Sequence, residues 1–491
     1  MSSIKRREFI GTSAAAAAAF TLPSAFLIKT ANSADANDKI GIGQIGMGGR
    51  GGELYRSFKP HKDVQIVAMA DPDSSRVADA ADAAGAKDYT DLRKLLEDKN
   101  VDAVTISTCN HWHCLAAIMA MQAGKDVYVE KPLSHTQWEG RQVVNAARKY
   151  KKIVQLGTQQ RSDPLQTQAK QFLHGDKALG KILYVQANRL GVRASIGKRS
   201  QVLVIPEEVN YDLWLGPAEE QKIFRNELHY DWHWDFNTGN GEMGNWGVHV
   251  LDDVRNVAYQ DSVTTPPRIL AVGARAAWND AGNTPNVHFV CFDTGAYPTM
   301  IALSNLNQAP DKKGSWKAPA GRDFSGPSSG YVVACEGGYY LGQRGSGKAI
   351  DLKGKEIRSF KGGDRMQLHT RNFLDAVRAQ DKNLLNSEIE VGHDSTGWCN
   401  LANVAFQTGG DYSRAKAESI MPNLEAWGAL LDNMEESLAK FGVKADSDSI
   451  KMSPILTHDP KSEQFTGEHA KTANQYLKRQ YRAGYAVPDL T

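Results

Sequence analysis

The sequence predicts an α/β protein with a doubly wound parallel sheet in its first part, followed by an α+β domain on an open, mostly antiparallel sheet. Two patterns predict this fold class. Between residues 38 and 157, short apolar runs alternate with amphipathic segments, as parallel β-α-β units do. Beyond residue 164, strand-like runs follow one another with few helices between them. The 491 residues are enough for two large domains.

The first predicted strand, Lys39–Ile45, leads into G-x-G-x-x-G at Gly46, Gly48 and Gly51. In a nucleotide-binding turn the first glycine permits the tight turn and the second lets the backbone approach a pyrophosphate. The third lets the following helix pack closely. The predicted cofactor contacts in this turn also include Met47, Gly49 and Arg50. These residues predict a Rossmann domain, which we place at residues 37–160.

A second strand is predicted over Asp63–Ala70, and Asp71 follows it, twenty residues after Gly51. A carboxylate at this position accepts hydrogen bonds from the adenosine ribose and repels a 2′-phosphate. The expected cofactor is therefore NAD rather than NADP. The alternative is that Asp71 only forms a turn.

The other elements of the first domain follow from the same alternation of patterns. Helices are predicted at Val77–Ala84, Asp91–Asp98, Leu115–Ala123 and Glu139–Lys149, and strands at Val101–Ser107, Asp126–Val129 and Ile153–Leu156.

Residues 161–400 are predicted to form the second domain, for substrate binding and oligomerisation, and residues 401–491 C-terminal helices and a tail that pack back on both domains. After a helix at Gln166–His174, strands are predicted at Ile182–Arg189, Arg268–Trp278, Val287–Phe292, Thr299–Asn305 and Tyr331–Glu336. Tyr211–Trp246 is predicted to be a long aromatic loop and Asp311–Gly330 an exposed excursion. Helices at Leu368–Ala379 and Trp398–Gln407 are expected to return to the first domain.

Charge and composition exclude several classes of partner. The net charge is +2 with acidic and basic residues well mixed, which argues against nucleic acid or an anionic membrane and favours a small uncharged ligand. His111 and His113 are only two residues apart, and no third ligand follows at helical spacing, so no metal site is expected.

The N-terminus resembles a twin-arginine export signal over residues 1–36. Arg6 and Arg7 precede an Ala-rich apolar run, Gly11–Ile28, and small residues that suit cleavage follow. A membrane anchor is the alternative, but the run is short and only modestly apolar against the ~20 residues that a span needs. We therefore expect a periplasmic or otherwise exported protein without a stable membrane span. An exported protein must fold around its cofactor before crossing, so the cofactor is expected to stay bound.

Two strand ends carry the candidate chemistry. Thr108, Asn110 and His113 follow one predicted strand, and Glu130 and Lys131 follow the next. Ligands bind outside the carboxyl ends of strands in α/β sheets, so all five are predicted to face the cofactor. Burial beside the nicotinamide would lower the pKa of Lys131 and make it a proton shuttle. A surface lysine is the alternative.

Together the motifs resemble the Gfo/Idh/MocA oxidoreductases, and more closely their exported members. They are the glycine turn, NHWH at Asn110–His113, GKDVYVEKPL at Gly124–Leu133, GTQQRS at Gly157–Ser162 and GEMGNWGVHVLD at Gly241–Asp252. The resemblance implies a Rossmann domain, an α/β domain whose open sheet often mediates homo-oligomers, and NAD(P)-dependent action on a sugar or cyclitol.

The resemblance implies roles for two residues of these motifs. Lys131 matches the family's catalytic lysine, and His249 matches the histidine that works with that lysine. Many members have Asp four residues before that histidine, where this chain has Asn245. Asn cannot exchange a proton, although it can orient a hydroxyl or the histidine. The resemblance therefore leaves open whether the proton relay is altered or relocated.

An aromatic stretch favours a carbohydrate substrate. Trp214, Trp232 and His233 alternate apolar faces with hydrogen-bonding groups, which suits a pyranose, although such residues also pack in cores. Gln159 and Arg161, after the last predicted Rossmann strand, are candidates for substrate contacts or for structural roles.

Two classes of enzyme remain after this comparison. The first interconverts a sugar or cyclitol hydroxyl and ketone, with Lys131 and His249 handling the hydroxyl proton. The second resembles glycoside hydrolase family 109: transient oxidation at C3 acidifies the neighbouring C–H, the aglycone leaves, water adds and the ketone is reduced again. Its base would be His249 or Tyr211. A non-catalytic sugar-binding relative is a third possibility.

Overall fold

The computed structural model describes residues 39–320, 324–447 and 449–490. The elements below all lie in one compact unit, Ile40–Thr491. The predicted export signal, residues 1–36, lies outside the described residues. Within the described ranges, no helix has both the length and the apolar character needed to cross a membrane.

The first domain is built on a six-stranded, fully parallel sheet in the order β3-β2-β1-β4-β5-β6. The strands are β1 (Ile40–Ile45), β2 (Val64–Ala70), β3 (Lys87–Tyr89), β4 (Ala103–Ile106), β5 (Asp126–Val129) and β6 (Val154–Leu156). The helices are α1 (Gly49–Phe58), α2 (Ser74–Ala84), α3 (Leu92–Leu96), α4 (Asn110–Gln122) and α5 (Gln137–Tyr150). The strand order reverses beside β1, and this is the point where α/β sheets bind ligands.

Helix α4 begins earlier than predicted. Its residues Asn110–His113 form the first helical turn rather than a loop, and nearly the whole helix is buried. A helix buried all round lacks the amphipathic period that marks surface helices, so its start is invisible in the pattern. The consequence is that Asn110 and His113 are held on a rigid element.

The second domain carries a mixed sheet in which β7 and β10 pair in parallel and the other neighbours pair antiparallel. Its main strands are β7 (Ile182–Leu190), β8 (Arg268–Ala274), β9 (Val287–Asp293), β10 (Thr299–Ser304), β13 (Ser329–Cys335), β14 (Gly338–Gln343), β15 (Ser346–Asp351) and β16 (Glu356–Lys361). Short strands β17 (Gly410–Asp411), β18 (Lys451–Met452), β19 (Leu456–Asp459) and β20 (Gln464–Thr466) extend it. The predicted fold class is confirmed.

The prediction of an exposed excursion at Asp311–Gly330 is wrong in part. A hairpin of β11 (Asn307–Ala309) and β12 (Lys312–Ser315) leads to Trp316, which is buried in the same core cluster as Trp427. Lys312, Lys313, Gly314 and Ser315, which are among the residues that suggested exposure, form the second strand of the hairpin, whereas Trp316 anchors the segment.

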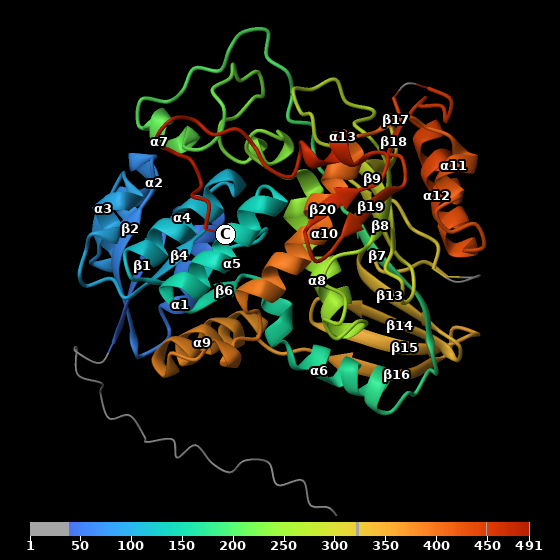
Figure 1. Cartoon of the computed structure of the whole chain (residues 1–491), viewed down its shortest axis with the longest axis horizontal. Coiled ribbons are helices and arrows are strands. Elements are labelled where there is room, and N and C mark those ends of the chain that lie inside the picture. Colours follow the sequence, from blue (N-terminus) through green and yellow to red (C-terminus); the bar gives the residue numbers. More distant parts are fainter. Residues whose placement is uncertain (1–38, 321–323, 448, 491) are drawn as a thin grey trace, which may run out of the picture. The chain divides into compact units, whose positions relative to one another are not determined.

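Helices join the two domains (Figure 1). As predicted, α9 (Arg365–Ala379) packs on the first domain, where Phe373 contacts Phe58 and Tyr128 edge to face. The last residues run back along α5, where the Leu490 N–H donates to Gln142 Oε1 at 2.7 Å. The remaining helices are α6 (Pro164–Lys170), α7 (Tyr211–Leu215), α8 (Val248–Val257), α10 (Ile389–Gln407), α11 (Arg414–Glu418), α12 (Glu425–Ala439) and α13 (Ala470–Asn474).

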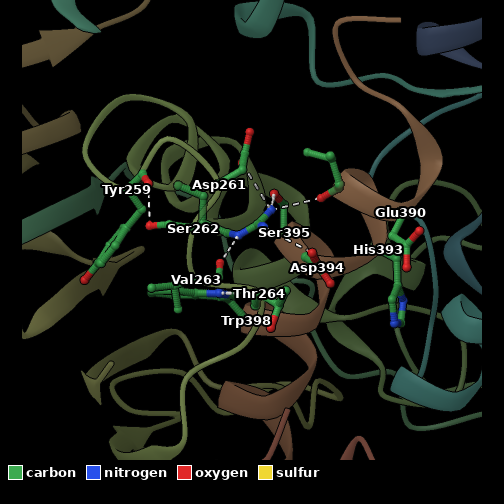
Figure 2. A network of polar contacts seen from close by, with 12 residues as sticks. Tyr259, Asp261, Ser262, Val263, Thr264, Glu390, His393, Asp394, Ser395 and Trp398 are labelled. Atoms are coloured by element: carbon green, nitrogen blue, oxygen red, sulfur yellow. Dashed lines mark hydrogen bonds and ion pairs between the residues drawn. The ribbon is translucent and has the colours of Figure 1, made fainter. Parts of the chain in front are cut away.

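A buried polar network holds α8 against α10 (Figure 2). The fully buried Arg255 on α8 donates to Ser395 Oγ at 2.6 Å and pairs with Asp394 at 3.2 Å, both on α10. It also donates to the Val263 carbonyl at 3.0 Å, and Trp398 Nε1 donates to the neighbouring Thr264 carbonyl at 2.8 Å. Because α8 also carries His249, this network fixes one wall of the site described below.

Arg161 belongs to the same buried region, which favours the structural role over the substrate contact among the two roles predicted for it. Its guanidinium pairs with Asp252 at 2.7 Å and forms a fork with Asp261 at 2.8 and 2.9 Å. These carboxylates accept hydrogen bonds from all three of its nitrogen atoms, and Arg161 does not line the cleft described below, so a structural role is favoured.

Candidate active site

A cleft of about 770 Å³ runs along the carboxyl ends of the Rossmann strands into the aromatic segment of the second domain. A volume of this order suits a cofactor with a small substrate. Most of the predicted site residues line it: Gly46, Gly48, Gly49, Arg50, Asp71, Thr108, Asn110, His113, Glu130, Lys131, Gln159, Trp214, Trp232, His233, Asn245 and His249. Met47, Gly51, Tyr211 and Arg161 do not line it.

The glycine turn has the shape that a pyrophosphate needs. Gly46 has φ +89°, which favours glycine, and a Cβ on Gly51 would lie 2.1 Å from the Gly46 carbonyl oxygen. Gly48 caps α1 without a side-chain hydrogen bond, which leaves the N–H groups of that helix end free for an anion. The residues therefore fit a dinucleotide, and Gly51 acts by close packing rather than by contact.

Asp71 ends β2 with its carboxylate at the adenosine side of the cleft. Its two oxygens accept hydrogen bonds from the Met47 N–H at 2.7 Å and the Asp73 N–H at 3.0 Å, and burial raises its pKa. Arg76 lines the same end. Asp71 thus braces the glycine turn and still has lone pairs to offer a ribose.

Lys131 lies at the other end of the cleft, directly after β5. Its Nζ donates to the Asn245 carbonyl at 2.7 Å and lies 3.4 Å from Asn245 Oδ1. Burial lowers the pKa of Lys131 to about 8, although the neighbouring Glu130 carboxylate opposes this shift. An amine with such a pKa can take up and release a proton near neutrality.

Position 245 carries an amide in place of the family's carboxylate, but the carboxylate of Glu242 lies one hydrogen bond beyond that amide. Asn245 Nδ2 donates to Glu242 Oε2 at 3.0 Å, and the fully buried Glu242 pairs with Arg189 at 2.8 Å and Arg193 at 3.1 Å. Asn245 therefore joins Lys131 to a carboxylate whose charge two arginines balance.

His249 faces the same space from the start of α8. It follows the π-helical turn Met243–Gly247, and its ring lies 5.8 Å from that of Trp246. Burial, with the cations Arg344 and Lys131 nearby, holds the pKa of His249 well below its ordinary value. The ring is therefore neutral near pH 7 and can accept a proton only from a strong donor.

Aromatic rings form the substrate side of the cleft. Trp232 and His233 stack with centroids 3.6 Å apart, and Trp214 lines the adjoining wall. Tyr211 instead stacks on Trp214 at 5.8 Å and does not line the cleft, so its prediction as a catalytic base is corrected. Tyr211 is the first residue of α7, and of the two aromatic residues on this helix Trp214 lines the cleft.

Four further residues at this end of the cleft were not predicted as site residues, although two of them, Glu242 and Trp246, lie within the motif Gly241–Asp252. Trp246, Arg344 and Arg365 line the cleft, and Glu242 lies behind Asn245. Arg344 comes from the turn between β14 and β15, and Arg365 is the first residue of α9. Neither position follows a Rossmann strand, so only the packing of the domains brings them here.

Two protein-family models match the stretches of sequence that supply most of the residues of this cleft. Residues 40–158 match the Gfo/Idh/MocA model described as the oxidoreductase family with an NAD-binding Rossmann fold. Residues 194–317 match the model for the C-terminal alpha/beta domain of that family. The chain is thus similar to both domains of the Gfo/Idh/MocA oxidoreductases over these two stretches. The family resemblance predicted from the motifs is thereby confirmed.

Curated Gfo/Idh/MocA relatives match over part of their length. Inositol 2-dehydrogenase of Salmonella typhimurium is 37% identical over 137 residues, which are 27% of this chain and 40% of that protein. Inositol 2-dehydrogenase 4 of Saccharopolyspora erythraea is 30% identical over 177 residues, 35% of this chain and 52% of that protein. A glycosyl hydrolase family 109 protein of Solibacter usitatus is 35% identical over 123 residues, 23% of this chain and 28% of that protein. The chain thus spans about half or less of these relatives.

Solved structures share the fold. The WlbA dehydrogenase from Bordetella pertussis, in complex with NADH and UDP-GlcNAcA, has a TM-score of 0.53 at 16% identity and covers 74% of this chain and 94% of its own. Biliverdin reductase from Synechocystis sp., in complex with biliverdin and NADP⁺, has a TM-score of 0.53 at 15% identity, covering 74% and 98%. One holds NADH and the other NADP⁺, so the shared fold accepts either cofactor.

Proposed function

We propose that this protein is an NAD(P)-dependent oxidoreductase that acts on a hydroxyl group of a sugar or cyclitol. The observation that carries the proposal is the position of Lys131, an amine with a pKa of about 8 in the same cleft as the glycine turn. When bound, the nicotinamide ring would accept hydride from the carbinol carbon. The names of the inositol 2-dehydrogenase relatives support a polyol substrate.

In this proposal Lys131 removes the hydroxyl proton as a neutral amine. The Asn245 carbonyl orients its Nζ, and Glu242 holds the Asn245 side chain in place by accepting a hydrogen bond from its Nδ2. The neutral ring of His249 accepts a hydrogen bond from the substrate, and Trp232 and Trp214 cover the apolar face of the sugar.

The pH dependence tests this assignment through Asn245→Asp. A carboxylate 3.4 Å from Nζ stabilises the ammonium form and is expected to raise the pKa of Lys131 by about 1 unit or more. Since the base must be neutral, kcat/KM for oxidation rises with pH through about 8 in the parent and at higher pH in the variant. The measurement is the pH profile of kcat/KM, with the Kd of NADH followed in parallel. Identical profiles would make Asn245 purely structural.

We propose NAD as the preferred cofactor because of Asp71, although Arg76 at the same end offers a partner for a 2′-phosphate. Asp71→Ala is expected to weaken NADH binding by about 10- to 100-fold, through loss of charge-assisted hydrogen bonds, and NADPH binding much less. Fluorescence titration of both nucleotides measures this. Equal weakening of both would mean that Asp71 serves only the Met47 and Asp73 N–H groups.

A second candidate is a glycoside hydrolase that recycles its cofactor, as the family 109 resemblance implies. The specific observation in its favour is a set of three contacts that join the second domain to the turn after β2, next to Asp71. The Asn210 N–H donates to the Pro72 carbonyl at 2.8 Å, the Ser74 N–H donates to the Glu208 carbonyl at 3.0 Å, and His229 lies 2.9 Å from Asp73. A cofactor held beneath these contacts is retained through turnover, which suits chemistry without net redox.

Export by the twin-arginine route and homo-oligomerisation through the second sheet remain part of the proposal. Export suits the recycling hydrolase in particular, because free NAD is lost outside the cytosol.

One experiment separates the two candidates. Mature protein is purified without added nucleotide, assayed for bound NAD by absorbance and mass spectrometry, and then incubated with aryl glycosides or with free sugars and cyclitols. Retained NAD with aglycone release identifies the hydrolase. Turnover only with added NAD(P) and a free sugar or cyclitol identifies the dehydrogenase. Absence of both activities, with no nucleotide binding, would contradict the proposed function.

A further inference from the structure

The substrate end of the cleft carries two cations for which the described part of the chain supplies no ion-pair partner. Arg344 and Arg365 both line the cleft with Lys131 and His249. Among the residues that the structure describes, no carboxylate lies within 4.0 Å of either guanidinium and no protein hydrogen bond to their side chains is found.

The neighbouring arginines are different. Arg50 pairs with Glu130 at 2.7 Å and with Glu53, while Arg189 pairs with Glu242 at 2.8 Å. Arg189 and Arg344 both lie over the Trp246 ring, at 4.0 and 4.2 Å from its centroid. Arg189 thus has a carboxylate in addition to the ring, whereas the ring is the one close partner of the Arg344 guanidinium among the residues that the structure describes.

Leaving a half-buried guanidinium without an anion is unfavourable. Burial lowers the pKa of Arg344 to about 10, and only the more distant carboxylates, led by Asp253, oppose this shift. The guanidinium of Arg344 faces the cleft with N–H donors in a planar arrangement. This arrangement can form two parallel hydrogen bonds to a carboxylate. A bound anion would therefore relieve the cost of burial.

We propose that the substrate is an acidic sugar whose anionic group binds Arg344, with Arg365 as the second cation. This inference rests on the proposed function for its sugar and replaces the uncharged ligand expected from composition. Arg344 lies over Trp246, directly beside the residue that holds Lys131, so the anion would lie next to the reacting hydroxyl. The cofactor pyrophosphate has its own site at the α1 N-terminus.

The test uses the full-length protein loaded with NADH and measures binding by calorimetry, so that it does not depend on turnover. Matched pairs are titrated: glucuronate against glucose, galacturonate against galactose, and glucose 6-phosphate as a second kind of anion. We expect at least one acidic sugar to bind about 10- to 100-fold more tightly than its neutral counterpart, as for hydrogen bonds between charged groups. Preference for the uronates would identify a carboxylate, and preference for glucose 6-phosphate a phosphate ester.

Arg344→Gln is expected to remove this preference while NADH affinity stays unchanged, and Arg344→Lys to restore part of it. The matched control is Gln343→Ala, an exposed position in the same turn outside the cleft lining, which should keep the parent preference. Equal binding of acidic and neutral sugars, or loss of NADH affinity in Arg344→Gln, would overturn the inference. Turnover of neutral sugars in that case would leave the proposed function intact, whereas failure of NADH to bind at all would contradict the function itself.

Discussion

Replacing Lys131 by methionine is expected to lower kcat/KM by about 10²- to 10⁴-fold, the usual contribution of a positioned general base. Methionine keeps the length and apolar stem of the side chain but cannot take a proton from the substrate. The glycine turn and Asp71 lie at the other end of the cleft, so the Kd of NADH should change little. Steady-state kinetics and NADH fluorescence titration together measure this separation.

Lys125→Met is the matched control for that variant. Lys125 is also a largely buried lysine, but it lies just before β5 rather than just after it and donates to the Asp98 and Val101 carbonyls at 3.0 and 2.7 Å. Its loss should lower thermal stability and leave kcat/KM unchanged. Undiminished turnover in Lys131→Met would remove Lys131 from the mechanism.

Replacing Arg255 by alanine is expected to lower the free energy of unfolding by about 3–5 kcal/mol, because it leaves a buried carboxylate without its partner. The guanidinium joins α8 to Asp394 and Ser395 of α10 and to the Val263 carbonyl (Figure 2). Since α8 carries His249, we expect kcat/KM to fall as well. Denaturant unfolding followed by tryptophan fluorescence measures the loss.

The control is Arg56→Ala, which removes an exposed arginine from the last turn of α1 and should change stability by less than about 0.5 kcal/mol. An unfolding midpoint for Arg255→Ala equal to that of Arg56→Ala would contradict the role given to the network. The conservative Arg255→Lys should recover only part of the stability, because an ammonium cannot form the same fork.

The Rossmann half of the fold was predictable because its signals are local. Fully buried parallel strands appear as short apolar runs, and each is followed by the residues that face the cleft. The motif that contains Lys131 and the glycine turn therefore pointed to positions that the structure brings into one cleft. The start of α4 at Asn110 was not predictable, because a helix that is buried on every side has no amphipathic period.

Positions in the second domain were harder to predict, since its strands pair across long stretches of chain. Tyr211 and Trp214 look equivalent in the sequence, but α7 turns only Trp214 into the cleft. Arg161 follows the last Rossmann strand, where a substrate contact is expected, yet its guanidinium forms ion pairs with Asp252 and Asp261. Such partners lie about a hundred residues away, and no local pattern reports them.

The sequence by itself determined the dinucleotide turn, the position of Lys131 at a strand end and the order of elements in the first domain except for the short, mostly exposed strand β3, because these depend on neighbours within a few residues. Only the tertiary structure decided which charges are neutralised. Glu242 binds Asn245 and Arg189, whereas no carboxylate among the described residues pairs with Arg344, although β7, the β14–β15 turn and the segment before α8 meet at this place. Electrostatic character depends on distances in space, and those distances follow from packing rather than from position along the chain.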